Sequence, residues 1–235
     1  MSLIDPIANQ PALVIDHKIL LISDLHLGLS YFYDNKARND LINLEKVKLI
    51  RILKKNKVKK LIIAGDLKDS ILDMYHTKKD ISSFLEDILN YVEKVILIKG
   101  NHDSKLEKLL DKGLLNKVEI DGQYILHIKD HKILIVHGHK KHNLPDKTKI
   151  LISGHYHPEV SIGNSRNIPL KAWVVINAVT ETGDKLKWII LPAFSNMVGG
   201  FNISSLSQES FVRLAPIRGI RIIKVNRFLL DLTPI

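Results

Sequence analysis

The chain has 235 residues, of which 45% are hydrophobic and 26% charged, a composition that is typical of a globular domain and excludes a disordered or collagen-like chain. It contains no cysteine, so thiol catalysis, cysteine-ligated zinc and iron–sulfur clusters are excluded. Lysine and arginine outnumber aspartate and glutamate by 35 to 25, and the resulting net charge of +10 favours a polyanionic partner, although solubility alone would also explain it.

The N-terminal residues 1–10 include Asp5, Pro6 and Asn9 and lack the apolar core of a signal peptide. The apolar runs further along the chain are much shorter than the roughly 20 residues that span a bilayer. We therefore expect a soluble cytoplasmic protein without a membrane partner, formed by one domain over residues 1–235. The sequence leaves the oligomeric state open.

Short runs of isoleucine, valine and leucine recur along the chain and are typical of strands that are buried on both faces. They cover residues 19–22, 61–64, 95–98, 133–136 and 150–152. Between the first three runs, apolar residues at helical spacing predict helices over about 41–55 and 78–92, and a short helix is predicted over 104–111, ending at Gly113. Strand–helix–strand order at this spacing predicts a parallel or mixed sheet.

Beyond residue 118 the helical pattern fades, and apolar segments separated by turn residues predict strands. These segments cover residues 118–127, 133–137, 172–179, 186–191 and 221–232. Asp121-Gly122 and Gly183-Asp184 are predicted turns, and the polar stretch 160–170 predicts a loop.

Each of the five apolar runs leads into residues that are able to bind a metal ion. In chain order the runs are followed by Asp-Leu-His, Gly-Asp, Gly-Asn-His-Asp, His-Gly-His and Gly-His-Tyr-His. Because the carboxyl ends of strands form the ligand crevice of an open α/β sheet, we expect these side chains to converge. The candidate metal ligands are Asp24, His26, Asp66, Asn101, His137, His155 and His157.

This set of ligands also indicates the kind of metal site. Carboxylate, imidazole and amide groups without a thiolate suit Mn²⁺, Zn²⁺ or iron rather than Ca²⁺. Seven protein ligands are too many for one transition-metal ion with an open position, but they suit two ions bridged by one carboxylate. Two ions roughly 3.5–4 Å apart can hold a phosphoryl group and generate a hydroxide nucleophile near neutral pH.

In this order, the five motifs resemble the five blocks of the calcineurin-like metallophosphoesterases. Residues 24–28, 154–158 and 191–194 read Asp-Leu-His-Leu-Gly, Gly-His-Tyr-His-Pro and Leu-Pro-Ala-Phe, and they are most similar to the archaeal SbcD-related phosphoesterases and the bacterial ligase-associated phosphoesterases. The resemblance implies a four-layer α-β-β-α sandwich of two mixed sheets. Periodicity alone supports only a mixed α/β fold.

The resemblance also implies how the ligands are shared between two divalent metal ions. One ion would take Asp24, His26, Asp66 and His157, and the other would take Asp66, Asn101, His137 and His155. Asp66 would bridge the two ions, and a hydroxide between them would attack phosphorus in line with the leaving oxygen. Mn²⁺ is the expected metal, with Zn²⁺, iron, Ni²⁺ and Mg²⁺ as alternatives.

Two further residues are implied in catalysis, and three in substrate binding. His102 would protonate the leaving group or stabilise the charged transition state. Asp103 would orient His102 or support it from behind, although it would serve equally well as a turn former after a strand. His139 would contact the phosphate or support a ligand, and Lys140 and Lys141 are candidate phosphate contacts because they directly follow the His-Gly-His motif.

The expected function is hydrolysis of phosphate esters by a phosphodiesterase or nuclease that acts on nucleic acid or nucleotides. The alternatives are a phosphomonoesterase, a nucleic-acid binder without cleavage, and a non-catalytic metal-binding scaffold of the same fold. At Asp69 the chain departs from the branch it resembles, which often has a histidine there.

Other residues are open to both functional and structural interpretations. Tyr31, Phe32 and Tyr33 would line the mouth of the site or seal the core beneath it. A basic C-terminal segment would be a nucleic-acid face or a charged, solvated strand edge. It comprises Arg213, Arg218, Arg221, Lys224 and Arg227. The histidines outside the motifs are not expected to be ligands; they are His17, His76, His127, His131 and His142.

Overall fold

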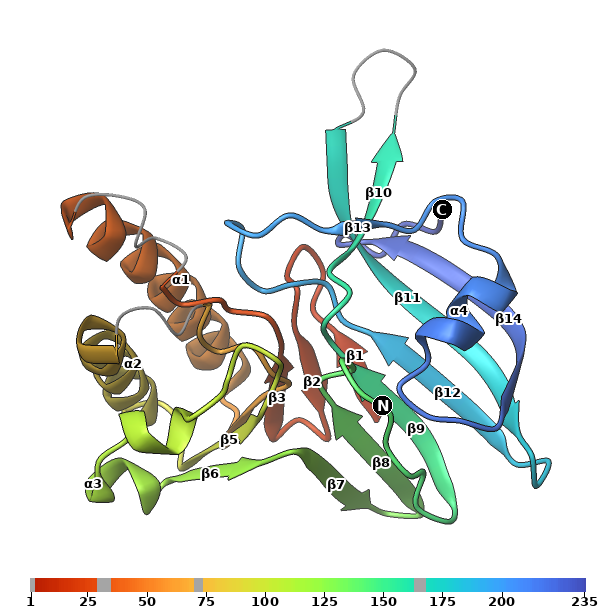
Figure 1. The fold of residues 1–235 in the computed structure, drawn as a ribbon, viewed down its shortest axis with the longest axis horizontal. Coiled ribbons are helices and arrows are strands. Elements are labelled where there is room, and N and C mark those ends of the chain that lie inside the picture. Colours follow the sequence, from red (N-terminus) through yellow and green to blue (C-terminus); the bar gives the residue numbers. More distant parts are fainter. Residues whose placement is uncertain (1–2, 29–34, 70–73, 163–167) are drawn as a thin grey trace.

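Two mixed β-sheets lie face to face, and helices cover their outer faces (Figure 1). The computed structural model describes residues 3–28, 35–69, 74–162 and 168–235. The expected α/β fold with two mixed sheets is confirmed. Within the described residues, no helix combines the length and the apolar character that a membrane-spanning segment needs.

The first sheet has six strands in the order β1-β2-β3-β4-β5-β6. They are β1 (Ile4–Pro6), β2 (Leu13–Ile15), β3 (Ile19–Ile22), β4 (Lys60–Ile63), β5 (Lys94–Ile98) and β6 (Val118–Asp121). The strands from β3 to β6 run parallel, and the first two pairs are antiparallel. The helices α1 (Asn35–Asn56) and α2 (Met74–Leu89) cover its outer face, followed by the short 3₁₀ turn η2 (Leu106–Leu109) and α3 (Lys112–Leu115).

The second sheet is built mainly from the C-terminal half of the chain, in the order β13-β10-β11-β12-β9-β8-β7, with β14 paired to β11. Its strands are β7 (Gln123–Ile128), β8 (His131–Val136), β9 (Thr148–Ser153), β10 (Pro158–Ile162), β11 (Ile168–Thr180), β12 (Lys185–Ile190), β13 (Phe201–Asn202) and β14 (Ile220–Leu229). The helix α4 (Gln208–Leu214) packs on its outer face through the buried Phe211.

Successive side chains of a strand point to opposite faces of its sheet, and both faces are covered here, which explains the continuous apolar runs in the sequence. On β4, Leu61 and Ile63 pack under the helices, whereas Ile62 faces the second sheet. On β8, Ile133 and Ile135 face the first sheet, and Leu134 and Val136 face outward into the α4 side of the core. Both faces of these two strands are therefore buried, and the apolar layer between the sheets fixes the positions of the strand ends.

Several predicted elements differ from the observed ones. The segment 118–127 is not one strand, because the chain passes from β6 in the first sheet to β7 in the second at Gly122. The predicted loop 160–170 contains the end of β10 and the start of β11, which pair with each other. The predicted helix 104–111 is replaced by η2 and α3, and Gly113 lies inside α3. The sequence patterns gave no sign of β1, β2, β13 or α4.

Candidate metal centre

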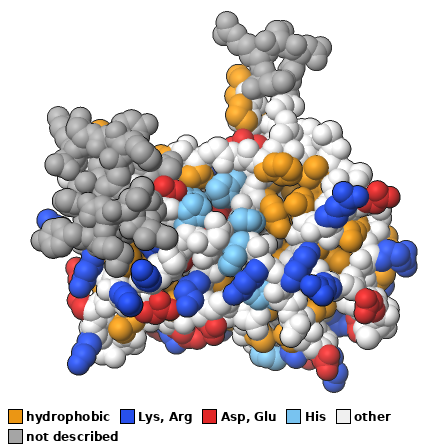
Figure 2. Space-filling model, viewed as in Figure 1, with side chains coloured by type: hydrophobic (Ala, Val, Ile, Leu, Met, Phe, Trp, Pro, Cys, Tyr) orange, Lys and Arg blue, Asp and Glu red, His pale blue; other side chains and the backbone are white. Residues whose placement is uncertain are grey.

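The strands β3, β4 and β5 of the first sheet and β8 and β9 of the second end close together, and the residues that follow them converge. Figure 2 shows histidine side chains gathered in the middle of this face of the molecule. The side-chain atoms that could bind a metal ion fall into two main groups, within each of which they all lie within 4.8 Å of one another. The Asp24 group contains Asp24, His26 and His157, and the Asp66 group contains Asp66, His137 and His155.

The Asp24 group joins the end of β3 to the loop before β10. Nε2 of His157 lies 3.2 Å from Oδ1 of Asp24 and 3.3 Å from Nε2 of His26. The Asp24 side chain is fully buried, and its carboxylate also accepts a hydrogen bond from the backbone N–H of His155 at 3.1 Å. A carboxylate oxygen and two imidazole nitrogens therefore lie close enough together to share one ion.

The Asp66 group joins the ends of β4, β8 and β9. Nε2 of His137 lies 3.1 Å from Oδ2 of Asp66 and 3.2 Å from the amide oxygen Oδ1 of Asn101. The rings of His137 and His155 pack edge to face with their centroids 4.9 Å apart. This group therefore offers carboxylate, amide and imidazole donors.

The Asp66 carboxylate lies between the two groups. Its Oδ2 atom is 3.1 Å from Nε2 of His137 and 3.8 Å from Nε2 of His26. Its Oδ1 atom accepts a hydrogen bond from the backbone N–H of His102 at 3.0 Å, which fixes the rotation of the carboxylate. One aspartate thus faces histidines of both groups, which is the arrangement that a bridging ligand requires.

Left-handed backbone conformations are concentrated among these residues. Positive φ angles are found at Asp24 (57°), His26 (47°), Asp66 (50°), His155 (73°) and His157 (42°). Such angles are uncommon for residues with a β-carbon, and they persist where the surrounding structure enforces them. The backbone is therefore bent sharply at each of these strand ends, which turns the side chains towards one another.

Two glycines in the motifs allow the close approach of neighbouring ligands. A β-carbon on Gly65 would collide with the imidazole of His137, and one on Gly100 would collide with the carboxylate of Asp66. Gly65 also has a φ of 93°, which favours glycine. Both motif glycines are therefore required by the packing of the site.

The histidines are oriented through their Nδ1 atoms. Nδ1 of His26 donates to the carboxylate of Asp69 at 3.1 Å, and Nδ1 of His157 donates to the carbonyl of Gly199 at 2.9 Å. Nδ1 of His137 donates to the carbonyl of Ala64 at 2.9 Å. With Nδ1 engaged in this way, Nε2 is the nitrogen of each ring that points into the groups, as in many metal sites. The sequence pattern marks Asp69 only as a departure from the family branch, and it does not predict the contact of Asp69 with His26 or that of Gly199 with His157.

The two carboxylates are held in their ionised form. Burial alone would raise the pKa of Asp24, but the hydrogen bond from His157 and the charge of His137 lower it below its usual value. Burial also acts against ionisation of Asp66, but the hydrogen bond and charge of His137 lower its pKa well below its usual value. The carboxylates of Asp24 and Asp66 therefore both carry negative charge at neutral pH, as metal ligands must.

Two of the imidazoles have a raised pKa, and two have a lowered one. Burial lowers the pKa of His137 less than Asp66 and Asp24 raise it, and the balance brings it to about 9. Burial lowers the pKa of His157, but the hydrogen bond and charge of Asp24, together with the Gly199 carbonyl and the charge of Asp66, raise it by more, so that it lies above its usual value. Burial lowers the pKa of His26 and of His155, which favours their neutral, ligating form.

His102 lies beside the groups, half-buried, with its ring centroid 5.1 Å from that of His26. Its Nδ1 donates to the backbone carbonyl of Asp69, so that the ring is held by the same residue that orients His26. A third cluster of possible ligand atoms combines His26, Asp66 and His102. The ring is therefore within reach of a group bound at the centre.

Asp103 is buried and acts on the backbone around it. Its carboxylate accepts hydrogen bonds from the N–H groups of Gly100 at 2.9 Å, Lys68 at 3.2 Å and Leu67 at 3.4 Å. The buried ammonium of Lys68 in turn donates to the carbonyl of His102. Asp103 thus ties the loop after β5 to the loop after β4, and its carboxylate has no recorded bond to the ring of His102.

The three candidate phosphate contacts lie in different surroundings. The ring of His139 is 5.4 Å from that of His137, and burial together with the charge of His137 lowers its pKa to about 4. Its Nδ1 is buried and has no hydrogen-bond partner among the described residues. Lys140 is exposed next to it. The ammonium of Lys141 instead donates to the carbonyls of Arg213 and Ala215 at the C-terminal end of α4.

The remaining candidates lie outside the two groups. In the basic C-terminal segment, Arg227 donates to the carbonyls of Ile203 and Leu206, and its guanidinium lies over the ring of Phe211, which favours a structural role for this residue. The other four are exposed or lie at the surface edge of β14; they are Arg213, Arg218, Arg221 and Lys224.

Tyr31, Phe32 and Tyr33 lie outside the described residues. None of the other histidines with described side chains belongs to a metal-ligating group.

The donors present fit divalent metal ions. Each group combines an ionised carboxylate with neutral or deprotonable imidazoles, and Asn101 adds an amide oxygen. There is no cysteine, and this donor set suits ions of intermediate hardness such as Mn²⁺, Zn²⁺ or Fe²⁺. The unpartnered Nδ1 of His139 at the edge of the groups is a further sign that a polar ligand belongs there.

Comparison with known proteins agrees with this geometry. A family model described as calcineurin-like phosphoesterase matches residues 17–223. The crystal structure of the Pseudomonas putida nuclease MPE matches over 99% of this chain and 100% of that one, with a TM-score of 0.61 and 19% identity. A novel archaeal phosphodiesterase matches over 73% of this chain and 98% of that one, with a TM-score of 0.40 and 19% identity. A search of curated protein sequences finds no significant match.

Proposed function

Because the chain belongs to the calcineurin-like phosphoesterase family, we propose that it hydrolyses phosphate esters with two divalent metal ions. The observation that carries the proposal is the position of the Asp66 carboxylate, which faces His137 of one group and His26 of the other. We further propose that residues 1–235 act as one domain, since ligands from both sheets converge on one site.

The chain's own residues define where each ion would be held. The Asp24 group together with Asp66 would hold one ion, and the Asp66 group together with Asn101 would hold the other. Such a pair, Mn²⁺ being the expected metal, supplies a nucleophilic water and neutralises charge on the phosphoryl group. The bonds to Asp69, Ala64 and Gly199 hold the imidazoles ready for this role.

His102 is the proposed catalytic residue. Its backbone N–H is fixed by Asp66 and its Nδ1 by the carbonyl of Asp69, so the Nε2 side of the ring is left to face a bound ester. From there it can donate a proton to the leaving oxygen or a hydrogen bond to the charged transition state. Asp103 is proposed to support it indirectly, by bracing the loop that carries it.

A phosphodiester in a nucleic acid or nucleotide is the proposed substrate. Figure 2 shows lysine and arginine side chains spread across the face that carries the histidines, where they would attract a polyanionic strand. The exposed Lys140, next to His139, is proposed to contact the phosphate. Similarity to one relative that is named a nuclease supports this choice, and the motifs at 24–28, 154–158 and 191–194 support the archaeal SbcD-related branch.

A matrix of metals and substrates tests the proposal. Purified protein is combined with Mn²⁺, Zn²⁺, Ni²⁺ or Mg²⁺ and assayed on a chromogenic diester, a monoester, and single- and double-stranded DNA, with His102→Ala as control. We expect metal-dependent cleavage of diesters that the variant lacks. Cleavage of monoesters alone would identify a phosphomonoesterase, and metal binding without hydrolysis of any ester would identify a scaffold.

A further inference from the structure

The segment that follows β12 lies directly against the residue at the end of β3 that begins the Asp24 group. The backbone N–H of Phe194 donates to the carbonyl of Ser23 at 2.8 Å, and that of Ser195 donates to the carbonyl of Asp24 at 3.2 Å. Asp24 has a left-handed φ of 57°, a conformation that needs support from outside the residue itself. Residues 193–196 supply this support from one side.

Two lysine side chains donate hydrogen bonds to the backbone carbonyl groups of the same segment. The ammonium of Lys171, on β11, donates to the carbonyl of Ala193 at 2.7 Å and to that of Ser195. The ammonium of Lys48, on α1, donates to the carbonyl of Phe194 at 2.6 Å. Three successive carbonyl groups are therefore bound by two cations that come from different layers of the molecule, a helix over the first sheet and a strand of the second.

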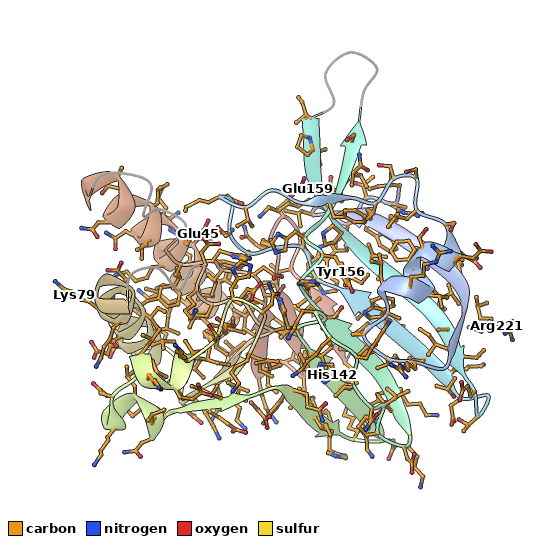
Figure 3. The ribbon with its side chains drawn as sticks, viewed as in Figure 1. Glu45, Lys79, His142, Tyr156, Glu159 and Arg221 are labelled. Atoms are coloured by element: carbon orange, nitrogen blue, oxygen red, sulfur yellow. The ribbon has the colours of Figure 1, made fainter. Side chains whose placement is uncertain are left out.

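A buried glutamate completes the arrangement. Glu45 on α1 (Figure 3) is 5% exposed, and its carboxylate accepts a hydrogen bond from the backbone N–H of Asn196 at 2.8 Å. The same carboxylate lies 3.5 Å from the ammonium of Lys48, whose Nζ also lies 4.1 Å from the centre of the Phe194 ring. The polar groups of this cluster thus bond to the segment 193–196 or to one another.

Holding two ammonium groups here is energetically unfavourable without such partners. Burial and the neighbouring Lys48 lower the pKa of Lys171 to about 8, while Glu45, Glu159 and Asp24 act in the opposite direction. Burial lowers the pKa of Lys48 as well. Charged groups in such an environment are retained where their hydrogen bonds define a particular geometry.

We propose that Lys171 and Lys48 are positioning residues for the Asp24 group, holding Asp24 in ligating geometry through the backbone of residues 193–195. The inference rests on the proposed function, because it assigns the two lysines to one of the two metal ions. It also distinguishes the two groups: in the Asp66 group the carbonyl of Ala64 orients His137, so weakening the lysine cluster should affect mainly the ion at the Asp24 group.

The test compares Lys171→Met, Lys48→Met and the conservative Lys171→Arg in the full chain, with Lys187→Met as control. Lys187 is exposed on β12 and has no part in the cluster. The probe is Mn²⁺ alone. Its binding is followed by equilibrium dialysis, its spin coupling by electron paramagnetic resonance, and the stability of the metal-free protein by thermal unfolding.

We expect wild type and Lys187→Met to bind two coupled ions. In Lys171→Met and Lys48→Met one ion should bind about 10–100-fold more weakly, as when a supporting partner of a ligand is lost, so that isolated Mn²⁺ is seen at low concentration. Lys171→Arg keeps the charge and several N–H donors and should restore the coupled pair. If one methionine variant fails to fold, the other still gives the comparison.

Two results would overturn the inference. Two coupled ions with unchanged affinity in both methionine variants would show that the cluster does not position Asp24. An equal loss of affinity for both ions, in proportion to a loss of thermal stability, would show a merely structural role. Wild-type protein that binds fewer than two ions would contradict the proposed function as well, which separates the two failures.

Discussion

The Asp24 group and the Asp66 group contain the same kinds of ligand but are supported in different ways. In the Asp24 group, the carboxylate of Asp69 orients His26, and the lysine cluster holds the segment behind Asp24. In the Asp66 group, the fully buried His137 is oriented by the carbonyl of Ala64, at the end of β4. Side chains from distant elements thus stabilise one group, whereas the sheet itself stabilises the other. Substitutions outside the ligands should therefore weaken mainly the Asp24 group.

The largest effect is expected from Asp66→Asn, which removes the carboxylate that the two groups share. Both ions should bind more weakly, and the rate of hydrolysis should fall by more than about 100-fold, beyond the loss typical of an outer supporting partner. Metal titration calorimetry and a diester assay measure the two effects. Asp87→Asn, at a partly exposed aspartate on α2 that pairs with Lys46, is the matched control. Retention of both ions by Asp66→Asn would refute the shared role.

His102→Ala should separate chemistry from metal binding. Loss of a general acid is expected to lower kcat by about 10²–10⁴-fold. Both groups should keep their ions, because none of their ligands is changed. Metal analysis and single-turnover kinetics check this, with the exposed His127→Ala as control. Activity within a few-fold of wild type would remove His102 from the mechanism.

Asp69→Asn tests the difference between the groups directly. His26 would lose a charged hydrogen-bond partner, so the ion at the Asp24 group should bind about 10–100-fold more weakly. The ion at the Asp66 group should be unaffected, because the partner of His137 is a backbone carbonyl. Stepwise Mn²⁺ titration resolves the two affinities. Equal weakening of both would contradict the distinction.

The smallest effect, counted for a change of one pH unit, concerns the metal affinity of the Asp66 group. In the metal-free protein the pKa of His137 is about 9, so between pH 7 and 9 the imidazole must release a proton before it binds a metal. Affinity at the Asp66 group should therefore rise by up to about tenfold per pH unit and level off above pH 9. The same raised pKa stabilises the metal-free fold fully below about 6.5, and this contribution is lost as the pH rises through 9.

Calorimetry in buffers of different ionisation enthalpy measures the released protons. An affinity at the Asp66 group that does not change between pH 7 and 9 would contradict a protonated His137.

The sequence alone predicts the five strands that lead into the motifs, and the candidate ligand set, because both depend on local patterns. A strand that is buried on both faces appears in the sequence as a continuous apolar run, and the polar residue that follows the run lies at the carboxyl end of the strand. The outer partners could not be predicted in this way. Lys171 meets Ala193, and Lys48 meets Phe194, only once the sheets have packed, and nothing in the spacing of these residues signals the contact.

Lys141 is another residue whose contacts could not be predicted from the sequence. Its place after the His-Gly-His motif suggested a phosphate contact. In the structure its ammonium is bound to carbonyls at the end of α4, a short helix whose polar sequence offers only Phe211 as a buried residue. The helix α4, which provides these partners of Lys141, was thus itself not predicted from the sequence pattern.

Anomalous diffraction from crystals grown with Mn²⁺ tests the central claim most directly. The account predicts two manganese peaks roughly 3.5–4 Å apart, one at the Asp24 group and one at the Asp66 group, with the carboxylate of Asp66 contacting both. A single peak, or peaks that Asp66 does not touch, would contradict it.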